Sequence, residues 1–310
     1  MLKKLLVIFF ALISVLLLGC SSEEKTNESA AELGTEKNPI KMALVPATDT
    51  QKLVQTGEVL ADLLHKETGL YFKIDVPTSY TAVVTAIGAK TVDVGWLSPL
   101  PYVIAHDKYG AEVILTTVRD NASSYKSGII VRADSGIKKI EDLKGKKFAY
   151  VDPASTSGSL YAKDLLRSKG FDPVTFFSET IYAGGHDKVV TAVYNKQVDG
   201  GAIYMGMVEG KDAREKMIGQ IPDVMEKVII IEETESIPND TVTVRKDLPE
   251  ELVEKIRDGL MRVAETDEGK LSMTDMYGIT GFVIAKDSDY DSVRRIAKNE
   301  NITLEQLEKK

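Results

Sequence analysis

The segment Asp152–Tyr161 places a row of hydroxyl side chains and a glycine at the junction of a strand and a helix. Lys147–Val151 has the pattern of a short buried strand, and the apolar residues of Leu160–Lys169 recur at helical spacing. The triplet Ser155–Ser157 should therefore lie at a helix N-terminus, where unpaired backbone N–H groups and the positive end of the helix dipole favour an anion. Serine and threonine also cap helices for purely local reasons, so this segment alone leaves both explanations open.

The chain also contains a gapless internal repeat, whose two copies lie on either side of this segment in the sequence. Val83–Ser98 aligns with Val189–Tyr204 at a constant offset of 106, and eight of the sixteen aligned pairs are identical. Both copies would suit a generic helix–turn–strand unit, but agreement at this level without gaps favours two related lobes. Tyr80 and His186 stand three residues before the two copies, so they should enter helices at equivalent points.

The rest of the chain alternates strand-like runs with amphipathic helical stretches from Pro39 onward, which predicts an α/β fold with mainly parallel strands. The expected strand and helix pairs are 40–45 with 51–68, 71–76 with 81–89, 92–97 with 100–109, 147–151 with 159–169, 175–181 with 187–195 and 198–203 with 205–217. Each lobe should be an open sheet with flanking helices.

Ligands of open α/β sheets bind beyond the carboxyl ends of the strands. The loops after the first strand of each lobe carry Thr48 in lobe one and Ser155–Ser157 in lobe two. Two facing lobes would form a cleft lined by these residues with Tyr80 and His186.

The chain should cross between the lobes near residues 131–139 and return near 235–244, which makes a two-strand hinge. Lobe one is then 39–133 plus 242–310, and lobe two is 134–241. Tyr125 and Asp240 flank these crossings and join the candidate residues of the cleft.

The N-terminus has the features of an export signal. Lys3 and Lys4 precede the uncharged apolar run Leu5–Leu18, which is short for a membrane span, and Gly19 and Cys20 follow. This junction resembles a bacterial lipoprotein box, which implies cleavage after residue 19 and lipid attachment to Cys20; the alternative is an incidental cysteine in a simple secretory signal. Residues 20–38 are polar and aperiodic, as expected of a flexible tether.

Composition excludes several classes of function. The 310 residues carry a formal charge of −8, and loss of residues 1–19 leaves 37 basic and 47 acidic residues, a net of −10. Nucleic-acid binding therefore has little support, although a small anion can still bind to local N–H groups. Cys20 is the single cysteine, so no intramolecular disulfide forms.

On these residues the chain resembles the PhnD-like substrate-binding components of ABC importers for phosphonate, phosphite and phosphate. The resemblance covers about Ile40 to Gly281, and its most specific segments are Asp152–Tyr161, Tyr182–Asp199 and Ile237–Asp240. It implies a type II periplasmic-binding-protein fold and a lipid-anchored, monomeric protein on the outer face of the membrane. Such a protein captures a phosphorus oxyanion, uses no cofactor, and delivers the ligand to an ABC permease and its ATPase.

The resemblance also implies roles for individual residues. The anion-holding hydroxyls match Ser155, Thr156 and Ser157, a histidine matches His186, two tyrosines match Tyr80 and Tyr125, and an acid matches Asp240. Relatives that take aminoalkylphosphonates carry a further carboxylate after the strand equivalent to 198–203. Here that position reads Tyr204-Met205-Gly206-Met207, so Tyr204 is a candidate contact and recognition of a ligand amine is in doubt.

The chemistry of these groups suits a tetrahedral oxyanion. Hydroxyls and N–H groups can donate to its oxygens, and Asp240 can accept a hydrogen bond from a protonated phosphoryl oxygen. Sulfate has no proton to donate near neutral pH, so Asp240 would help to reject it.

Two other functions remain to be weighed against this one. A related two-lobed receptor could take another small solute, such as a sulfonate or a thiamine precursor. An enzyme could use Ser157 or Thr156 as nucleophile and His186 as base, but no G-x-S-x-G and no third triad member is present. The sequence also lacks H-E-x-x-H, P-loop and G-x-G-x-x-G motifs, and His65 and His106 have no partner at metal-ligand spacing.

Overall fold

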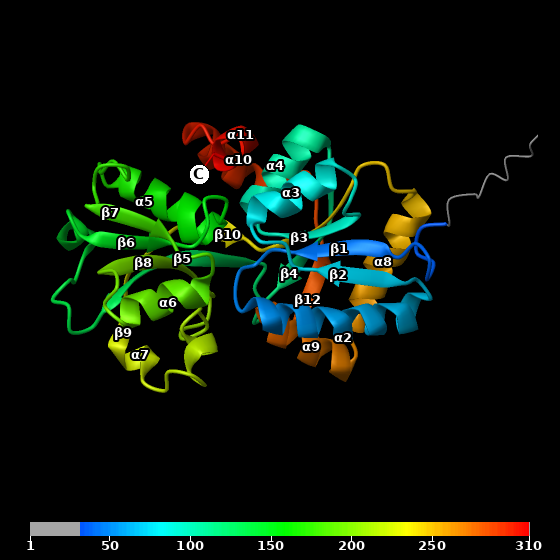
Figure 1. Cartoon of the computed structure of the whole chain (residues 1–310), viewed down its shortest axis with the longest axis horizontal. Helices are drawn as coiled ribbons and strands as arrows, with labels where there is room; N and C mark the ends of the chain where they lie inside the picture. The colour runs from blue at the N-terminus through cyan, green and yellow to red at the C-terminus, as the bar shows by residue number, and fades with distance from the viewer. Residues whose placement is uncertain (1–31, 310) are drawn as a thin grey trace, which may run out of the picture. The chain divides into compact units, whose positions relative to one another are not determined.

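The computed structural model describes residues 32–309, and residues 33–310 form one compact unit. The predicted signal sequence 1–19 and the predicted lipid-attachment residue Cys20 lie outside the described residues. None of the helices in the described part of the chain is long and apolar enough to cross a membrane. Figure 1 shows two sheets, each with helices on its faces, which define lobe one and lobe two.

Lobe one is built on a six-stranded sheet of order β12-β4-β11-β3-β1-β2. The parallel part is β2-β1-β3, whereas β11 and β12 run antiparallel to their neighbours. Its strands are β1 (Ile40–Leu44), β2 (Phe72–Asp75), β3 (Val94–Leu97), β4 (Glu112–Val118), β11 (Thr241–Val244) and β12 (Gly281–Ile284). Its helices are α2 (Thr50–Thr68), α3 (Tyr80–Gly88), α4 (Pro99–Tyr109), α8 (Glu250–Val263) and α9 (Asp267–Tyr277).

Lobe two is built on a sheet of order β10-β5-β8-β6-β7, with β9 paired to β5. Here β7-β6-β8 is parallel and β5 is antiparallel to its three partners. Its strands are β5 (Ser124–Arg132), β6 (Lys147–Tyr150), β7 (Glu179–Tyr182), β8 (Gly200–Met205), β9 (Val228–Glu233) and β10 (Ile237–Pro238). Its helical segments are a 3₁₀ turn (Ile140–Leu143), a π-helical turn (Thr156–Tyr161), α5 (Ala162–Ser168), α6 (His186–Tyr194), a 3₁₀ turn (Glu215–Met217) and α7 (Val224–Lys227).

The C-terminal segment follows β12 as a 3₁₀ turn (Asp287–Tyr290), α10 (Asp291–Asn299) and α11 (Leu304–Leu307). The buried side chains of α10 join a core cluster with α3, α4 and α6, so this cluster continues from one lobe into the other. Separate clusters lie under α2, α8 and α9 in lobe one and beneath α5 in lobe two.

The structure confirms the repeat. Lys90 and Lys196, 106 residues apart, both adopt the left-handed backbone conformation with φ of 58°. The carboxylate of Asp93 accepts a hydrogen bond from the Lys41 backbone N–H at 2.8 Å, and Asp199 accepts one from the Lys147 N–H at 2.9 Å. Because these pairs also keep the offset of 106, the two parallel units share their turn geometry as well as their sequence.

The structure differs from the expectations of the sequence pattern in three places. β5 belongs to the lobe-two sheet, so the first crossing lies at residues 119–123 and the lobe boundary near 133 was ten residues late. Residues 33–38 of the predicted tether form a turn on lobe one, in which the Gly34 carbonyl accepts from the Tyr71 N–H at 2.8 Å. The helix expected at 205–217 is a loop that ends in one 3₁₀ turn.

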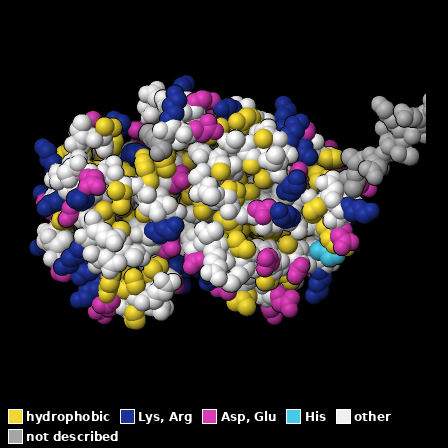
Figure 2. All heavy atoms as spheres, viewed as in Figure 1, with side chains coloured by type: hydrophobic (Ala, Val, Ile, Leu, Met, Phe, Trp, Pro, Cys, Tyr) yellow, Lys and Arg dark blue, Asp and Glu magenta, His cyan; other side chains and the backbone are white. Residues whose placement is uncertain are grey.

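Charged side chains of both signs are interspersed over both lobes on the face shown in Figure 2. No continuous basic patch is visible on this face.

Candidate functional site

A cavity of about 190 Å³ lies between the lobes at the carboxyl ends of the parallel strands. Both lobes and both crossing segments contribute to its wall. Of the residues singled out from the sequence, its lining contains Thr48, Tyr80, Tyr125, Ser155, Ser157, His186, Tyr204 and Asp240. The remaining candidate, Thr156, is not among the lining residues.

The hydroxyl segment enters the cavity through the tight π-helical turn after β6. The Ser155 hydroxyl accepts a hydrogen bond from the Gly158 N–H at 3.1 Å, which leaves its own proton to be donated. A Cβ on Gly158 would lie 2.3 Å from Cγ2 of Val151, so only glycine allows the turn to pack this closely. π-Helical turns of this kind are often found at functional sites.

Thr156 faces lobe one instead of the cavity. Its hydroxyl oxygen accepts a hydrogen bond at 2.8 Å from the N–H of Leu100, in the first turn of α4. The middle member of the triplet thus binds the lobes to each other.

His186, the first residue of α6, is buried with 4 % of its surface exposed. Its Nδ1 accepts a hydrogen bond from the Tyr204 N–H at 3.0 Å, so the ring proton of the neutral imidazole is on Nε2. Burial, assisted by the charge of Arg119, lowers the pKa of His186 to about 3. His186 is therefore a neutral donor at physiological pH, and its Nε2 cannot act as a catalytic base.

The tyrosines of the cavity are donors as well. Tyr80 begins α3, Tyr125 lies on β5, and both are buried. Burial is the main reason why the pKa of both phenols lies well above the usual value. The negative charge of Asp152 raises the pKa of Tyr80 further, and that of Asp240 raises the pKa of Tyr125 further. Burial likewise raises the pKa of Tyr204, whose ring packs edge-on against His186 with centroids 5.0 Å apart.

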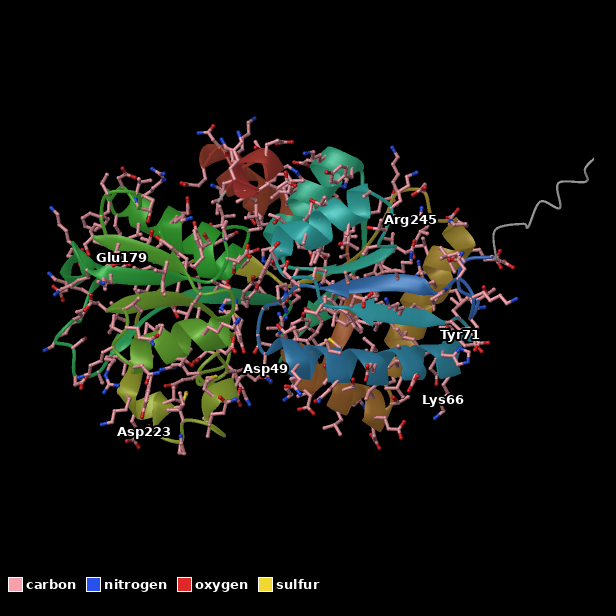
Figure 3. The ribbon with its side chains drawn as sticks, viewed as in Figure 1. Asp49, Lys66, Tyr71, Glu179, Asp223 and Arg245 are labelled. Carbon is pink, nitrogen blue, oxygen red and sulfur yellow. The ribbon has the colours of Figure 1, made fainter. Side chains whose placement is uncertain are left out.

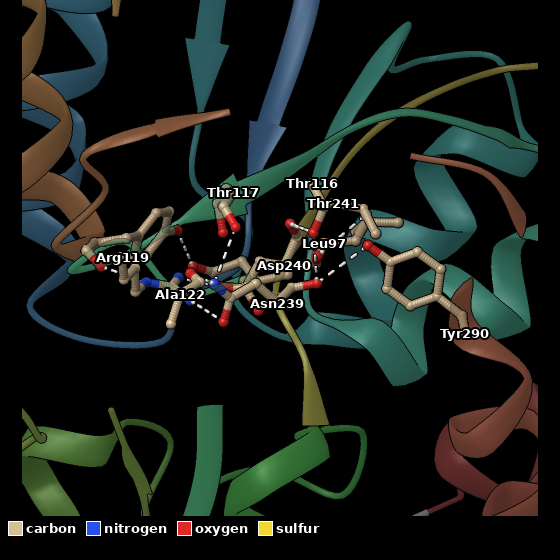
Figure 4. A network of polar contacts seen from close by, with 11 residues as sticks. Leu97, Thr116, Thr117, Arg119, Ala122, Asn239, Asp240, Thr241 and Tyr290 are labelled. Carbon is tan, nitrogen blue, oxygen red and sulfur yellow. Dashed lines mark hydrogen bonds and ion pairs between the residues drawn. The ribbon is translucent and has the colours of Figure 1, made fainter. Parts of the chain in front are cut away.

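The two crossing segments meet in the polar network shown in Figure 4. Arg119 forms an ion pair with the Oδ2 atom of Asp240 and donates through Nε to the Tyr277 carbonyl at 2.8 Å. Fully buried Asn239 donates to the carbonyls of Thr117 and Ala122, both at 2.9 Å. Asp240, predicted from the sequence, is thus held by Arg119, which the sequence did not single out.

Ser98 is a second lining residue that sequence reasoning missed. It precedes α4 without capping it, and its buried hydroxyl has no hydrogen-bond partner among the described residues. The repeat contained the signal that would have identified it, because Ser98 aligns with Tyr204, which was a candidate. Nothing in the sequence near Arg119 or Tyr277 carries a comparable signal.

Hydrogen bonds join the lobes directly across the cavity rim. The His186 N–H donates to the Ala47 carbonyl at 3.0 Å, and the backbone N–H of Tyr80 on lobe one partly offsets the rise that burial causes in the pKa of Asp152 on lobe two. Figure 3 places Asp49, which caps α2, at the side of lobe one that faces lobe two. Together with the Thr156–Leu100 bond, these contacts define a closed arrangement in which helix N-termini of both lobes take part.

Comparison with known proteins identifies the family of this two-lobed, donor-lined site. A family model described as the phosphonate ABC transporter periplasmic substrate-binding protein matches residues 42–290. The chain belongs to this family. It is accordingly a substrate-binding component of a phosphonate-type ABC transporter, and a binding protein instead of an enzyme.

Individual relatives extend this result. The chain is 28 % identical over 307 residues to the phosphate-import protein PhnD of Mycolicibacterium smegmatis, covering 92 % of each chain. It is 26 % identical to the phosphonates-binding periplasmic protein of Escherichia coli, covering 87 % of this chain and 79 % of that protein.

Solved structures support the fold. A binding protein component of an ABC phosphonate transporter from Pseudomonas aeruginosa superposes with a TM-score of 0.75 at 25 % identity, over 83 % of this chain and 85 % of that one. PhnD1 of Prochlorococcus marinus, solved in complex with methylphosphonate, gives 0.75 at 20 % identity, over 84 % and 98 %. The two-lobed fold predicted from the sequence is confirmed, but its sheets are mixed, whereas mainly parallel sheets were expected.

The described residues contain no group of His, Cys, Asp and Glu side chains arranged to hold a metal ion.

Proposed function

We propose that the cavity binds a single phosphorus oxyanion, namely phosphite, phosphate or a small alkylphosphonate, and delivers it unchanged to the permease. The observation that carries the proposal is the set of neutral donors that converge from both lobes: Tyr80, Tyr125, Ser155, Ser157 and His186. Each can donate to an oxyanion, and a water-poor cavity strengthens such charge-assisted bonds.

Neutral donors suit an importer because their hydrogen bonds can hold an anion without a cationic side chain at each ligand oxygen. The phenol protons of Tyr80 and Tyr125 and the Nε2 proton of His186 are retained at any physiological pH, as their shifted pKa values require. The donor set therefore stays constant while the ligand changes its protonation state.

Asp240 supplies the selectivity against sulfate in this proposal. Its Oδ2 is bound to Arg119, and its Oδ1 can accept a hydrogen bond from a protonated phosphoryl oxygen. Sulfate would instead bring a lone pair against a carboxylate oxygen, which is repulsive.

A calorimetric titration tests the proposal. The chain from Ser21 onward, which contains the compact unit 33–310, is titrated with phosphite, phosphate, methylphosphonate and sulfate. We expect at least one phosphorus oxyanion to bind at least a hundredfold more tightly than sulfate. Absence of heat with all three phosphorus compounds, or equal affinity for sulfate, would reject the proposal.

We also propose that residues 1–19 are a cleaved signal sequence and that Cys20 carries the lipid that anchors the protein to the extracytoplasmic face of the membrane. The support is the charged start, the apolar run and the single cysteine directly after it. The chain between Cys20 and the packed turn at 33–38 would be the tether, and the anchored protein would act as a monomer.

The test of anchoring is fractionation of cells that express the chain or its Cys20→Ser variant. The parent protein should sediment with membranes and the variant should not. Membrane association of the variant equal to that of the parent would contradict lipid attachment at Cys20.

A further inference from the structure

Arg119 is a charged side chain of the cavity wall that the proposed function leaves unused. It reaches the cavity from the first crossing segment, and its side chain and that of Asp240 are 16 % and 17 % exposed. Three groups fix the guanidinium: the Asp240 carboxylate, the Tyr277 carbonyl, and the Asn239 side-chain oxygen at 3.4 Å. Because Asn239 is itself held by two carbonyls, Arg119 has a fixed position in the wall.

The carboxylates of the cavity wall are already paired. Asp212 is bonded to Arg214 at 2.7 Å, Glu215 is paired with Lys211, and Asp240 is paired with Arg119. The fourth lining carboxylate, Asp120, is exposed, and water screens exposed charges. A cationic group on a ligand would therefore find no buried carboxylate that lacks a cationic partner, and the remaining Oδ1 of Asp240 belongs to a carboxylate already paired with Arg119.

The charge of Arg119 also reaches the whole cavity. It contributes to the low pKa of His186 on lobe two, and it opposes the burial effects that raise the pKa values of Tyr125, Tyr204 and Tyr277. Burial opposes the charged form of Arg119 itself, but Asp240 outweighs it and raises the pKa of the guanidinium. Arg119 thus stays charged in a site with little screening.

Size does not set the limit on the ligand. The cavity of about 190 Å³ is more than ten times the ~10–15 Å³ that holds one water, whereas phosphate has five non-hydrogen atoms. The space could accept an aminoethyl group as readily as other small substituents.

We infer that Arg119 is a specificity-determining residue that excludes phosphonates with a cationic substituent. It pairs with the Asp240 carboxylate through Oδ2 and places its own positive charge beside the ligand. The ligand class is then a phosphorus oxyanion that carries hydrogen, hydroxyl or an uncharged alkyl group. This inference rests on the proposed function of the same cavity.

Calorimetry with methylphosphonate and 2-aminoethylphosphonate tests the inference on the chain from Ser21 onward. The unmodified chain should bind methylphosphonate at least tenfold more tightly. Arg119→Met should shift the affinity ratio at least tenfold toward 2-aminoethylphosphonate, because it frees Asp240 for the ammonium group. Adding Asp240→Asn to this variant should abolish the shift.

Arg245→Met is the matched control. Arg245 is also a partly buried arginine in an ion pair, with Asp93 at 2.9 Å, but it lies on lobe one away from the cavity (Figure 3). This variant should keep the original affinity ratio.

Two results would overturn the inference: an unchanged ratio in Arg119→Met, or a preference of the unmodified chain for 2-aminoethylphosphonate. If Arg119→Met lacks a cooperative thermal transition, Arg119→Gln replaces it, since glutamine removes the charge and keeps a donor, and the same ratio decides. Failure of the proposed function is distinct, because then the unmodified chain binds neither phosphonate.

Discussion

Single residues of this cavity owe their chemistry to one contact each. His186 is a donor because the Tyr204 N–H occupies Nδ1, and the Ser155 hydroxyl is a donor because the Gly158 N–H occupies its oxygen. In both cases a backbone N–H occupies an acceptor lone pair and leaves the side-chain proton available to a ligand. The backbone therefore determines that these two side chains act as hydrogen-bond donors and not as acceptors.

The buried His186 predicts a pH dependence of stability. Its folded-state pKa of about 3 lies below the unfolded value of 6.5, so the unfolded chain binds more protons between these values and stability falls as the pH falls below 6.5. From pH 7 to 5.5 this group alone should cost about 1 kcal/mol, from 1.36 kcal/mol per pKa unit.

Urea unfolding of the chain and of His186→Asn at pH 7 and 5.5 measures this contribution. The other titrating groups are common to both proteins and cancel in the comparison. The unmodified chain should lose about 1 kcal/mol more than the variant, and equal losses would show that His186 titrates normally in the folded state.

At the scale of elements, the repeat made much of the site predictable. Tyr80 and His186 both begin helices, as their equal spacing from the repeat indicated, and Tyr204 lies one residue before the end of β8. Local pattern could not show which sheet accepts β5, because a strand that is buried along most of its length suits the interior of either sheet. The local pattern also could not show that Arg119 would contact Asp240, because 121 residues separate them and only the folded chain brings them together.

The π-helical turn is the element on which the hydroxyls depend. Gly158→Ala would force a Cβ to within 2.3 Å of the Val151 side chain, so the turn must shift. Overpacking of this kind costs about 1–3 kcal/mol, and the displaced Ser155 and Ser157 should weaken oxyanion binding at least tenfold.

Gly219→Ala is the control for this substitution, because nothing lies within 4 Å of its added Cβ. Chemical unfolding and oxyanion titration of both variants provide the measurement. Unchanged stability and affinity in Gly158→Ala would mean that the turn does not position the hydroxyls.

At the scale of the whole molecule, closure couples the lobes through the helix N-termini that face the cavity. Thr156→Val removes the hydroxyl oxygen that accepts a hydrogen bond from the Leu100 N–H. In this variant the Leu100 N–H can bond to water only when the lobes are separated. The free energy that favours closed over separated lobes should therefore fall by about 0.5–1.5 kcal/mol, the net value of one hydrogen bond. Oxyanion affinity should fall about two- to tenfold as a result.

Titration and small-angle scattering of Thr156→Val in the presence of ligand measure this effect. Thermal stability of the ligand-free variant should change little by comparison. A variant that binds and closes like the parent chain would show that the Thr156–Leu100 bond does not contribute to closure.

A crystal structure of the chain with methylphosphonate would show directly whether a phosphorus oxyanion lies among the donors of both lobes. We expect a tetrahedral group in the cavity, with oxygens within hydrogen-bond distance of Ser155, Ser157, His186 and at least one of Tyr80 and Tyr125. A ligand bound outside this cavity, or held in it without contact to the lobe-two hydroxyls and His186, would show that the cavity is not the oxyanion site proposed here.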